Sequence, residues 1–170
     1  MTTKSFVSYE SNLEEISSSQ VMFVWLSYKL NKQWEVLKAF SDTTNSWKVI
    51  SQLEESCEGV SIHKTNLVQW VPLDEEWKIR YPNAKEKEKG LNNLLEEIEK
   101  IKPKIVYLFW KQVSDFVIKK LYVEKKSDFE YTQWDITFVL AHHPSYMYIY
   151  KRKELDNYIQ NIVQQIQNIL

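Results

Sequence analysis

Four apolar runs divide the chain and predict buried β-strands. They are VMFVW at residues 21–25, the mixed run VSIHKTNLV at 60–68, KIVYLFW at 104–110 and DITFVLA at 135–141. Nearly continuous apolar runs of this length are typical of strands that are covered on both faces, as in a parallel sheet. The pattern therefore predicts a sheet that lies between two layers of other elements.

Helical patterns occupy the segments between and after these runs. Apolar residues recur at helical spacing, with charged residues elsewhere, at residues 46–57, 84–101, 111–122 and 153–170. Strands that alternate with helices predict a three-layer α/β/α architecture. We expect one domain over residues 1–170, with a mainly parallel sheet of roughly four strands. Residues 72–83, between two prolines, are expected to form an exposed loop.

Ligands of such sheets bind outside the carboxyl ends of the strands. The expected ends lie near Trp25, Asn66, Trp110 and Ala141, and we expect them at one edge of the sheet. The last of these ends is followed at once by HHPSYMYIYKR, at residues 142–152. This run of histidines and aromatic residues therefore lies where an α/β protein keeps its site.

The composition of the chain excludes several kinds of binding site. The chain has 170 residues and a net charge of −1, so attraction to nucleic acid would have to come from a local patch. The single cysteine, Cys57, excludes an intrachain disulfide and any multi-cysteine metal or iron–sulfur site within the chain. The two glycines, Gly59 and Gly90, lie in neither a P-loop nor a dinucleotide fingerprint. The absence of a signal-peptide pattern and of long apolar runs leads us to expect a cytoplasmic protein with no membrane partner.

Five segments carry a family resemblance through their order and spacing. They are VMFVWLSYK, KAFSDTTNSWKVISQLEE, HKTNLVQWVP, IKPKIVYLFWKQVSDFV and TFVLAHHPSYMY, within roughly residues 20–165. Together they resemble the uracil-DNA glycosylase superfamily, and most closely its small branch (family 4/5-like) that often carries an iron–sulfur cluster. The resemblance implies a DNA glycosylase fold that takes an extruded base into a pocket at the strand ends.

The resemblance also implies residue roles. Phe40 takes the place of the aromatic residue that stacks on the base, and Asn66 that of the amide that reads the base edge. His143 takes the place of the catalytic histidine that polarises a base oxygen and stabilises developing negative charge. A nucleic-acid-binding surface is implied by the residues that follow, namely Ser145, Tyr148, Lys151 and Arg152, with Tyr146 and Tyr150 beside them.

The chain departs from the family pattern at the first strand end. The acidic residue of the family falls on Leu26, and leucine can neither accept a proton nor hold water. The family's glycine positions read Trp25, Lys29 and Trp110, and the two tryptophans are bulky enough to fill the space of a base. The cluster cysteines are absent, so we expect no cofactor. The polar residues near this strand end that are candidates to replace the acid are Asn31, Glu35 and Asp42.

Ordinary structural roles compete with these assignments. His143 suits a strand-end cap, Phe40 suits a core position, and Asn66 suits a turn. A metal site from His63, His142 and His143 is not expected, because adjacent histidines of a strand point to opposite faces.

Three interpretations stay open. The first is a divergent protein that binds a nucleobase, a nucleotide or single-stranded or damaged DNA and has weak or no glycosylase activity. The second is an active DNA glycosylase with a relocated acid. The third is a non-catalytic module for a protein partner. The loss of the carboxylate at Leu26 favours a non-hydrolytic role.

Overall fold

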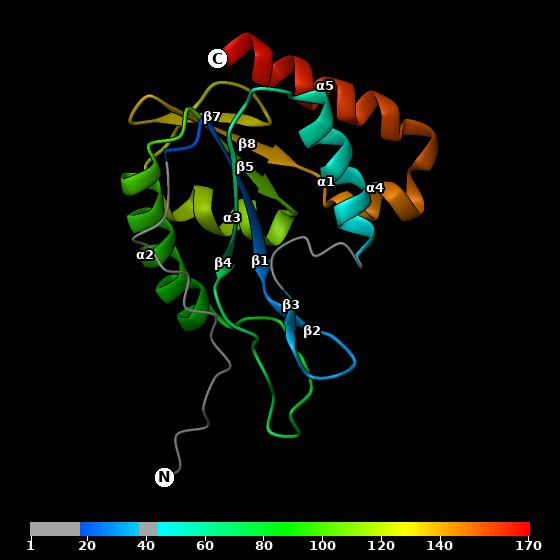
Figure 1. The fold of residues 1–170 in the computed structure, drawn as a ribbon. Helices are drawn as coiled ribbons and strands as arrows, with labels where there is room; N and C mark the ends of the chain where they lie inside the picture. The colour runs from blue at the N-terminus through cyan, green and yellow to red at the C-terminus, as the bar shows by residue number, and fades with distance from the viewer. Residues whose placement is uncertain (1–17, 38–43) are drawn as a thin grey trace.

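A six-stranded sheet forms the centre of the molecule (Figure 1). The computed structural model describes residues 18–37 and 44–170. The strand order is β4-β1-β5-β8-β7-β6. The first four strands in this order run parallel: β4 (Ile62–Val68), β1 (Val21–Ser27), β5 (Ile105–Phe109) and β8 (Ile136–Ala141). These are the four predicted strands, so the expected α/β class with a mainly parallel sheet is confirmed.

The sheet is wider than the sequence predicted. Two short strands, β7 (Glu130–Gln133) and β6 (Glu124–Lys125), add an antiparallel edge beside β8. Their residues are only partly buried or exposed, so they lack the continuous apolar pattern that revealed the central strands. A separate hairpin of β2 (Lys29–Leu30) and β3 (Val36–Leu37) follows β1 directly.

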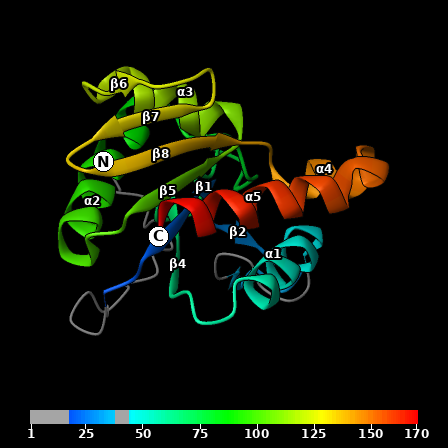
Figure 2. The same ribbon diagram turned by 90° about the horizontal axis from the view of Figure 1, so that it is seen from above.

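Helices cover both faces of the sheet (Figure 2). One face carries α1 (Asn45–Ser56), α4 (Pro144–Tyr150) and α5 (Leu155–Ile169), with a short 3₁₀ turn, η2 (Arg152–Glu154), before α5. The other face carries α2 (Ala84–Ile101) and α3 (Lys111–Lys120). This arrangement confirms the predicted three layers.

Strand β1 shows why its apolar run is continuous. Phe23 and Trp25 pack into the core beneath α1 and α5, whereas Val24 and Leu26 pack into the core beneath α2 and α3. Successive side chains of a strand point to opposite faces, so a strand covered on both sides needs apolar residues at every position.

Local signals set the ends of the helices. The Thr44 hydroxyl accepts from the Trp47 N–H at 3.2 Å and caps α1. Asn83 and Glu86 form a reciprocal capping box at the start of α2. Lys102, in the left-handed conformation, ends α2 directly before Pro103, as the sequence predicted.

Gly90 lets α2 lie directly against β4. A Cβ atom at this position would lie 2.0 Å from the carbonyl oxygen of Leu67, so any side chain here would force the helix and strand apart. This close packing fixes the end of β4, which carries Asn66.

The segment after β8, for which the sequence analysis assigned no secondary structure, forms the short helix α4. His143 is the N-cap of α4 and Pro144 occupies its first turn, where proline's missing N–H costs nothing. Helical geometry, with 3.6 residues per turn, decides which of the following side chains share a face.

Candidate functional site

The carboxyl ends of the four parallel strands meet at one edge of the sheet, as predicted. Trp25 lies opposite Asn66 in the β1–β4 register, and Phe109 lies opposite Ala141 in the β5–β8 register. A cleft of about 1020 Å³ opens at this edge. Its walls come from the end of β1, the β2–β3 hairpin, the start of α1, Asn66, residues 79–81, residues 110–111, the two histidines after β8 and one side of α4.

Asn66 brings an unpaired polar group to this cleft. Its side chain lines the cleft, although the residue is only 3% exposed. Within residues 18–37 and 44–170, its Nδ2 atom has no hydrogen-bond partner. Leaving a buried donor unpaired costs about 1–3 kcal/mol. An acceptor on a ligand, such as a carbonyl oxygen, would recover this cost.

His143 is held as a neutral donor. Its Nδ1 atom accepts from the backbone N–H of Ser145 at 3.2 Å and lies 2.8 Å from the Ser145 hydroxyl. A backbone N–H can only donate, so Nδ1 is unprotonated and the neutral ring carries its hydrogen on Nε2. Burial, aided by the positive charge of Lys29, lowers the pKa of His143 to about 4. The ring is therefore uncharged at neutral pH.

Two tryptophans line the cleft without closing it. Trp25 stacks on Phe109 with ring centroids 4.4 Å apart and is only 5% exposed, so it forms part of the floor. Trp110 precedes α3 with a φ of 87°, a backbone conformation that favours glycine. Its ring lies edge-on to His143 at 5.9 Å and next to Tyr81 at 5.5 Å. The sequence left open whether these rings fill the site, and the cleft retains its volume beside them.

The described wall of the cleft carries no carboxylate. Leu26 lies in this wall and also packs into the core. The described lining residues include cations, Lys29 among them, and neither aspartate nor glutamate. Glu35 and Asn31 close the β2–β3 hairpin, where Asn31 Nδ2 donates to Glu35 Oε2 at 2.8 Å, and neither lines the cleft. Asp42 lies outside the described residues.

Helix α4 and the residues before it line the cleft with part of the run that the sequence singled out. His142, Tyr146 and Tyr150 lie one turn apart and form a row of rings, with centroids 5.9 and 5.6 Å apart. These three residues, with Ser145 and Ile149, line the cleft. The row leads outward, because Tyr146 is 41% and Tyr150 is 72% exposed.

Tyr148, Lys151 and Arg152, which the sequence led us to expect in a nucleic-acid-binding surface, are not among the residues that line the cleft. Tyr148 contacts two cations, with Lys48 Nζ 5.0 Å and the Arg152 guanidinium 4.7 Å from its ring centroid. These cations and their hydrogen bonds lower the pKa of the Tyr148 hydroxyl, Lys48 most of all. Lys151 pairs with Glu154 at 3.1 Å.

The sequence missed the contribution of residues 79–81 to the cleft. The two prolines marked residues 72–83 as a loop, and it is one, apart from a single bridge between Leu73 and Ile79. Nothing in the local pattern indicated that the loop folds back to the strand ends. Phe40, the residue expected to stack on a base, lies outside the described residues.

Other sequence candidates are dispersed. The Nε2 atom of His63, on β4, lies 3.6 Å from the Oε2 atom of Glu97 on α2. Across the described part of the chain, no group of three or more histidine, cysteine, aspartate or glutamate residues is placed to hold a metal. No helix of the described ranges is long and apolar enough to cross a membrane.

Comparison with known proteins agrees with the observed fold. The family model of the Uracil DNA glycosylase superfamily matches residues 17–167, so this chain belongs to that superfamily. Among solved structures, the wild-type SMUG2 of Pedobacter heparinus is similar, with a TM-score of 0.57 and 12% identity over 89% of this chain and 76% of that chain. At this identity the likeness shows a shared fold. A comparison with curated proteins finds no match.

Proposed function

We propose that this protein binds an extruded nucleobase of single-stranded or damaged DNA in the strand-end cleft, with weak or no excision of the base. The observation that carries this proposal is one cleft that combines the unpaired amide of Asn66 with the neutral ring of His143, while its described wall lacks a carboxylate. Membership of the superfamily supports DNA as the source of the base.

The two polar groups suit a base that presents carbonyl oxygens. Asn66 Nδ2 donates to one acceptor of the base edge, and the Nε2–H of His143 donates to another. A neutral imidazole stabilises negative charge on that oxygen without needing to lose or gain a proton. The aromatic row of α4 and Trp110 would lie against the faces of unpaired bases.

The leucine at the position of the family's acid separates binding from cleavage in this proposal. Hydrolysis of a base–sugar bond needs a group that positions or activates water, and general acid–base catalysis contributes about 10²- to 10⁴-fold to such steps. At the matching position the chain has Leu26, which offers no acceptor. Base recognition therefore remains while the hydrolytic step is lost.

The proposal is tested with a labelled single-stranded oligonucleotide that contains one uracil. Binding is measured by fluorescence anisotropy, and excision by alkaline cleavage of abasic sites. We expect salt-sensitive binding, since phosphate contacts release counterions, and no cleavage above background. Asn66→Leu, which keeps the number and branching of the side-chain heavy atoms, should weaken binding. Absence of binding at low salt would contradict the proposal and leave a protein partner as the better hypothesis.

An active glycosylase with a relocated acid is the second candidate. Of the three polar residues near the first strand end, Asn31 and Glu35 are engaged in the hairpin. Asp42 remains, and it precedes Thr44, which lines the cleft, by two residues. Robust excision by the wild type, abolished in Asp42→Ala with binding intact, would establish this alternative.

A further inference from the structure

The turn between β2 and β3 presents an exposed tryptophan. Asn31 Oδ1 accepts from the backbone N–H groups of Gln33 and Glu35, both at 2.9 Å. The N–H of Trp34 donates to the Asn31 carbonyl at 3.1 Å, and the Asn31 N–H donates to the Glu35 carbonyl at 3.0 Å. The side chain of Asn31 thus organises the whole turn.

A second turn, within residues 74–78, repeats this arrangement. Asp74 Oδ1 accepts from the backbone N–H groups of Glu76 and Lys78, at 2.9 and 2.8 Å. The N–H of Trp77 donates to the Asp74 carbonyl at 3.2 Å, and the Asp74 N–H donates to the Lys78 carbonyl at 2.9 Å. Two segments distant in sequence therefore build the same turn with tryptophan in the same position.

Both tryptophans have a left-handed backbone conformation, which is unfavourable for a residue with a Cβ atom. Trp34 has a φ of 63° and Trp77 a φ of 64°, in the left-handed region where glycine is the usual residue. Burial does not offset this conformational cost, because the residues are 59% and 47% exposed. Strained, exposed aromatic residues are a reason to look for a binding role.

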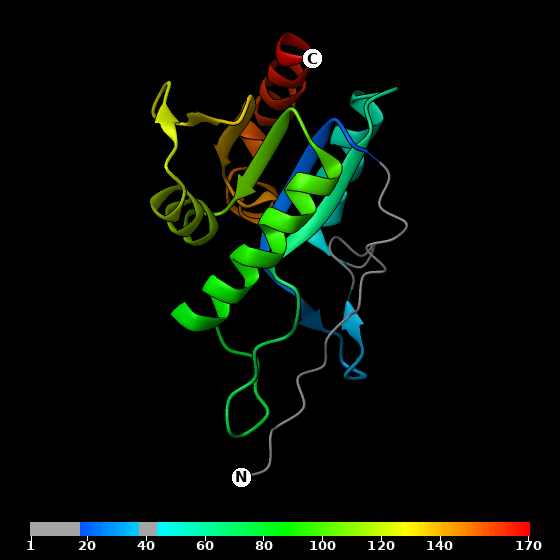
Figure 3. The ribbon, with the colours of Figure 1, turned by 90° about the vertical axis from the view of Figure 1, so that its left-hand side faces the viewer.

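Both turns extend the walls of the cleft. Lys29 and Leu37, from the β2–β3 hairpin, line the cleft on one side, and residues 79–81 line it from the other loop. Figures 1 and 3 show that both segments project beyond the carboxyl edge of the sheet. Trp34 and Trp77 do not line the cleft themselves and stand at the tips of these extensions.

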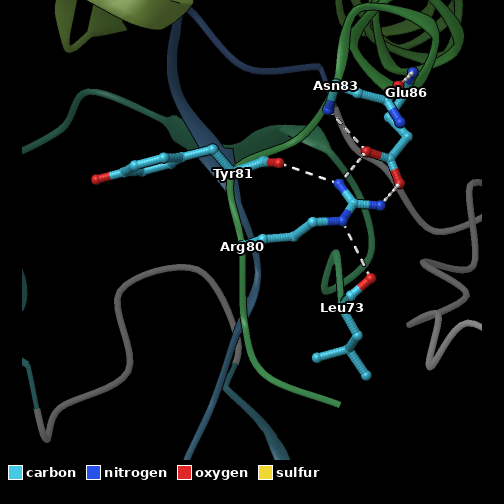
Figure 4. A network of polar contacts seen from close by, with 5 residues as sticks. All are labelled: Leu73, Arg80, Tyr81, Asn83 and Glu86. Atoms are coloured by element: carbon cyan, nitrogen blue, oxygen red, sulfur yellow. Dashed lines mark hydrogen bonds and ion pairs between the residues drawn. The ribbon is translucent and has the colours of Figure 1, made fainter. Parts of the chain in front are cut away.

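The loop that carries Trp77 is anchored. Arg80 donates two hydrogen bonds to Glu86, at 2.7 and 2.8 Å, and one each to the carbonyl oxygens of Leu73 and Tyr81 (Figure 4). The hydrogen bonds from Arg80 are the main cause of a lowered pKa at Glu86, so the pair stays ionised. The loop is thus tied to the first turn of α2, which limits its movement relative to the cleft.

We propose that Trp34 and Trp77 bind single-stranded nucleic acid by stacking on unpaired bases that flank the nucleotide in the cleft. This inference rests on the proposed function and adds a preference for unpaired strands. Stacking on an aromatic side chain needs a free base face, which a duplex does not offer, and it tolerates any base.

The charges around the two tips agree with contact to bases. The first turn lies near Lys29 and Lys32, which suit a phosphate backbone. The second turn carries Asp74, Glu75 and Glu76. Among the described residues, Glu76 is the one of these three with a side-chain ion pair, to Lys78 at 2.5 Å. Its excess negative charge would repel phosphates, so Trp77 contacts base faces and the carboxylates disfavour a second strand.

A third tryptophan supplies a matched control. Trp134 lies in the turn between β7 and β8 with a φ of 53° and is 61% exposed. This turn precedes β8 and therefore lies at the amino edge of the parallel strands, opposite the cleft. It shares the conformation and exposure of the other two but not their position.

The test replaces each tryptophan by glycine. Glycine suits a positive φ, so Trp34→Gly and Trp77→Gly should leave the thermal unfolding temperature unchanged or raise it. Binding to a fluorescein-labelled single-stranded oligonucleotide should weaken roughly 5- to 100-fold for each. Trp134→Gly should bind like the wild type. Trp34→Phe, which keeps a stacking ring, should retain most of the affinity, and a duplex of the same sequence should bind more weakly than the single strand.

The outcomes separate this inference from the proposed function. If the wild type binds and both cleft-side glycine variants bind equally well, the stacking role is overturned while the proposed function stands. Equal weakening by Trp134→Gly would also overturn it, because position would then not matter. If a glycine variant fails to fold, Trp34→Asn and Trp77→Asn serve in its place, since asparagine tolerates this conformation. No binding by the wild type would overturn both proposals.

Discussion

Two neighbouring strand ends of this molecule bring side chains of different chemistry to the candidate site. Asn66 and Trp25 are paired in register on β4 and β1, and Leu26 is the next residue of β1. The β4 end keeps an amide whose Nδ2 has no partner among the described residues. The β1 end presents leucine where the family pattern has an acid. Under the proposed function, recognition and cleavage depend on different strands, so one could be lost without disturbing the other.

The two positions differ in the free-energy cost of the side chain that each carries. A buried amide without a partner costs free energy and persists where a ligand supplies that partner. Leu26 costs nothing, since it packs into the core beneath α2 and α3 and is only 5% exposed. The comparison therefore predicts that changes at β4 alter binding, whereas changes at β1 alter chemistry.

The largest effect is expected where β4 meets α2. Gly90→Ala would place a methyl group 2.0 Å from the Leu67 carbonyl oxygen and should lower the free energy of unfolding by about 3 kcal/mol. Chemical denaturation would measure this. Gly59→Ala is the control: it introduces strain at a φ of 82° but no contact within 4 Å, so a loss of about 1 kcal/mol is expected. If the two variants lost the same free energy of unfolding, the close contact between α2 and β4 would not be the reason for glycine at position 90.

A carboxylate at the β1 end should restore part of the chemistry. Leu26→Asp should raise uracil excision roughly 100-fold above the wild-type background, because it returns an acceptor for water. The buried charge should also lower stability by about 2 kcal/mol. Alkaline cleavage of a uracil-containing oligonucleotide gives the rate, and Leu26→Asn, uncharged and nearly the same size as aspartate, is the control. If Leu26→Asp excises uracil no faster than Leu26→Asn, the end of β1 does not supply the group that acts on water.

Removing the amide at β4 should separate binding from stability. Asn66→Leu should weaken binding of the uracil-containing strand by about 10-fold, through the loss of one buried hydrogen bond. The same change should leave thermal stability equal or higher, since it removes an unpaired buried donor. A variant that binds normally would show that the amide does not contact the ligand.

The smallest effect concerns the pH dependence of His143. Its pKa is about 4 in the folded protein, below its ordinary value of 6.5, so the unfolded chain binds more protons between these values. Stability should therefore rise by about 1 kcal/mol from pH 4 to 6.5 through this residue and stay level above, after allowance for its partial exposure. His143→Asn, which can still cap α4, should flatten this slope in denaturation curves. An NMR titration that gives a pKa near 6.5 would contradict the neutral donor.

Much of the framework was predictable from local patterns. The continuous apolar runs revealed β1, β5 and β8, and the helical spacing between Asn83 and Lys102 revealed α2 with both of its ends. The rule that parallel strands present their ends at one edge placed Asn66 and His143 at the same cleft. These features depend on near neighbours in the chain, and their signals are therefore written in short stretches of sequence.

Three features were decided only by tertiary structure. The turn of α4 placed His142, Tyr146 and Tyr150 in the cleft wall and Tyr148 away from it, whereas the sequence alone showed one undivided run. The loop before α2 folded back to bring Tyr81 against Trp110.

The protonation of His143 is the third feature. It follows from burial and from Lys29, a residue more than one hundred positions away. The sequence by itself determined the strands, the helices and the edge at which their ends meet, because these depend on local periodicity. Which side chains face the cleft, and in which charge state, depends on contacts between distant segments, and these exist only once the chain has folded.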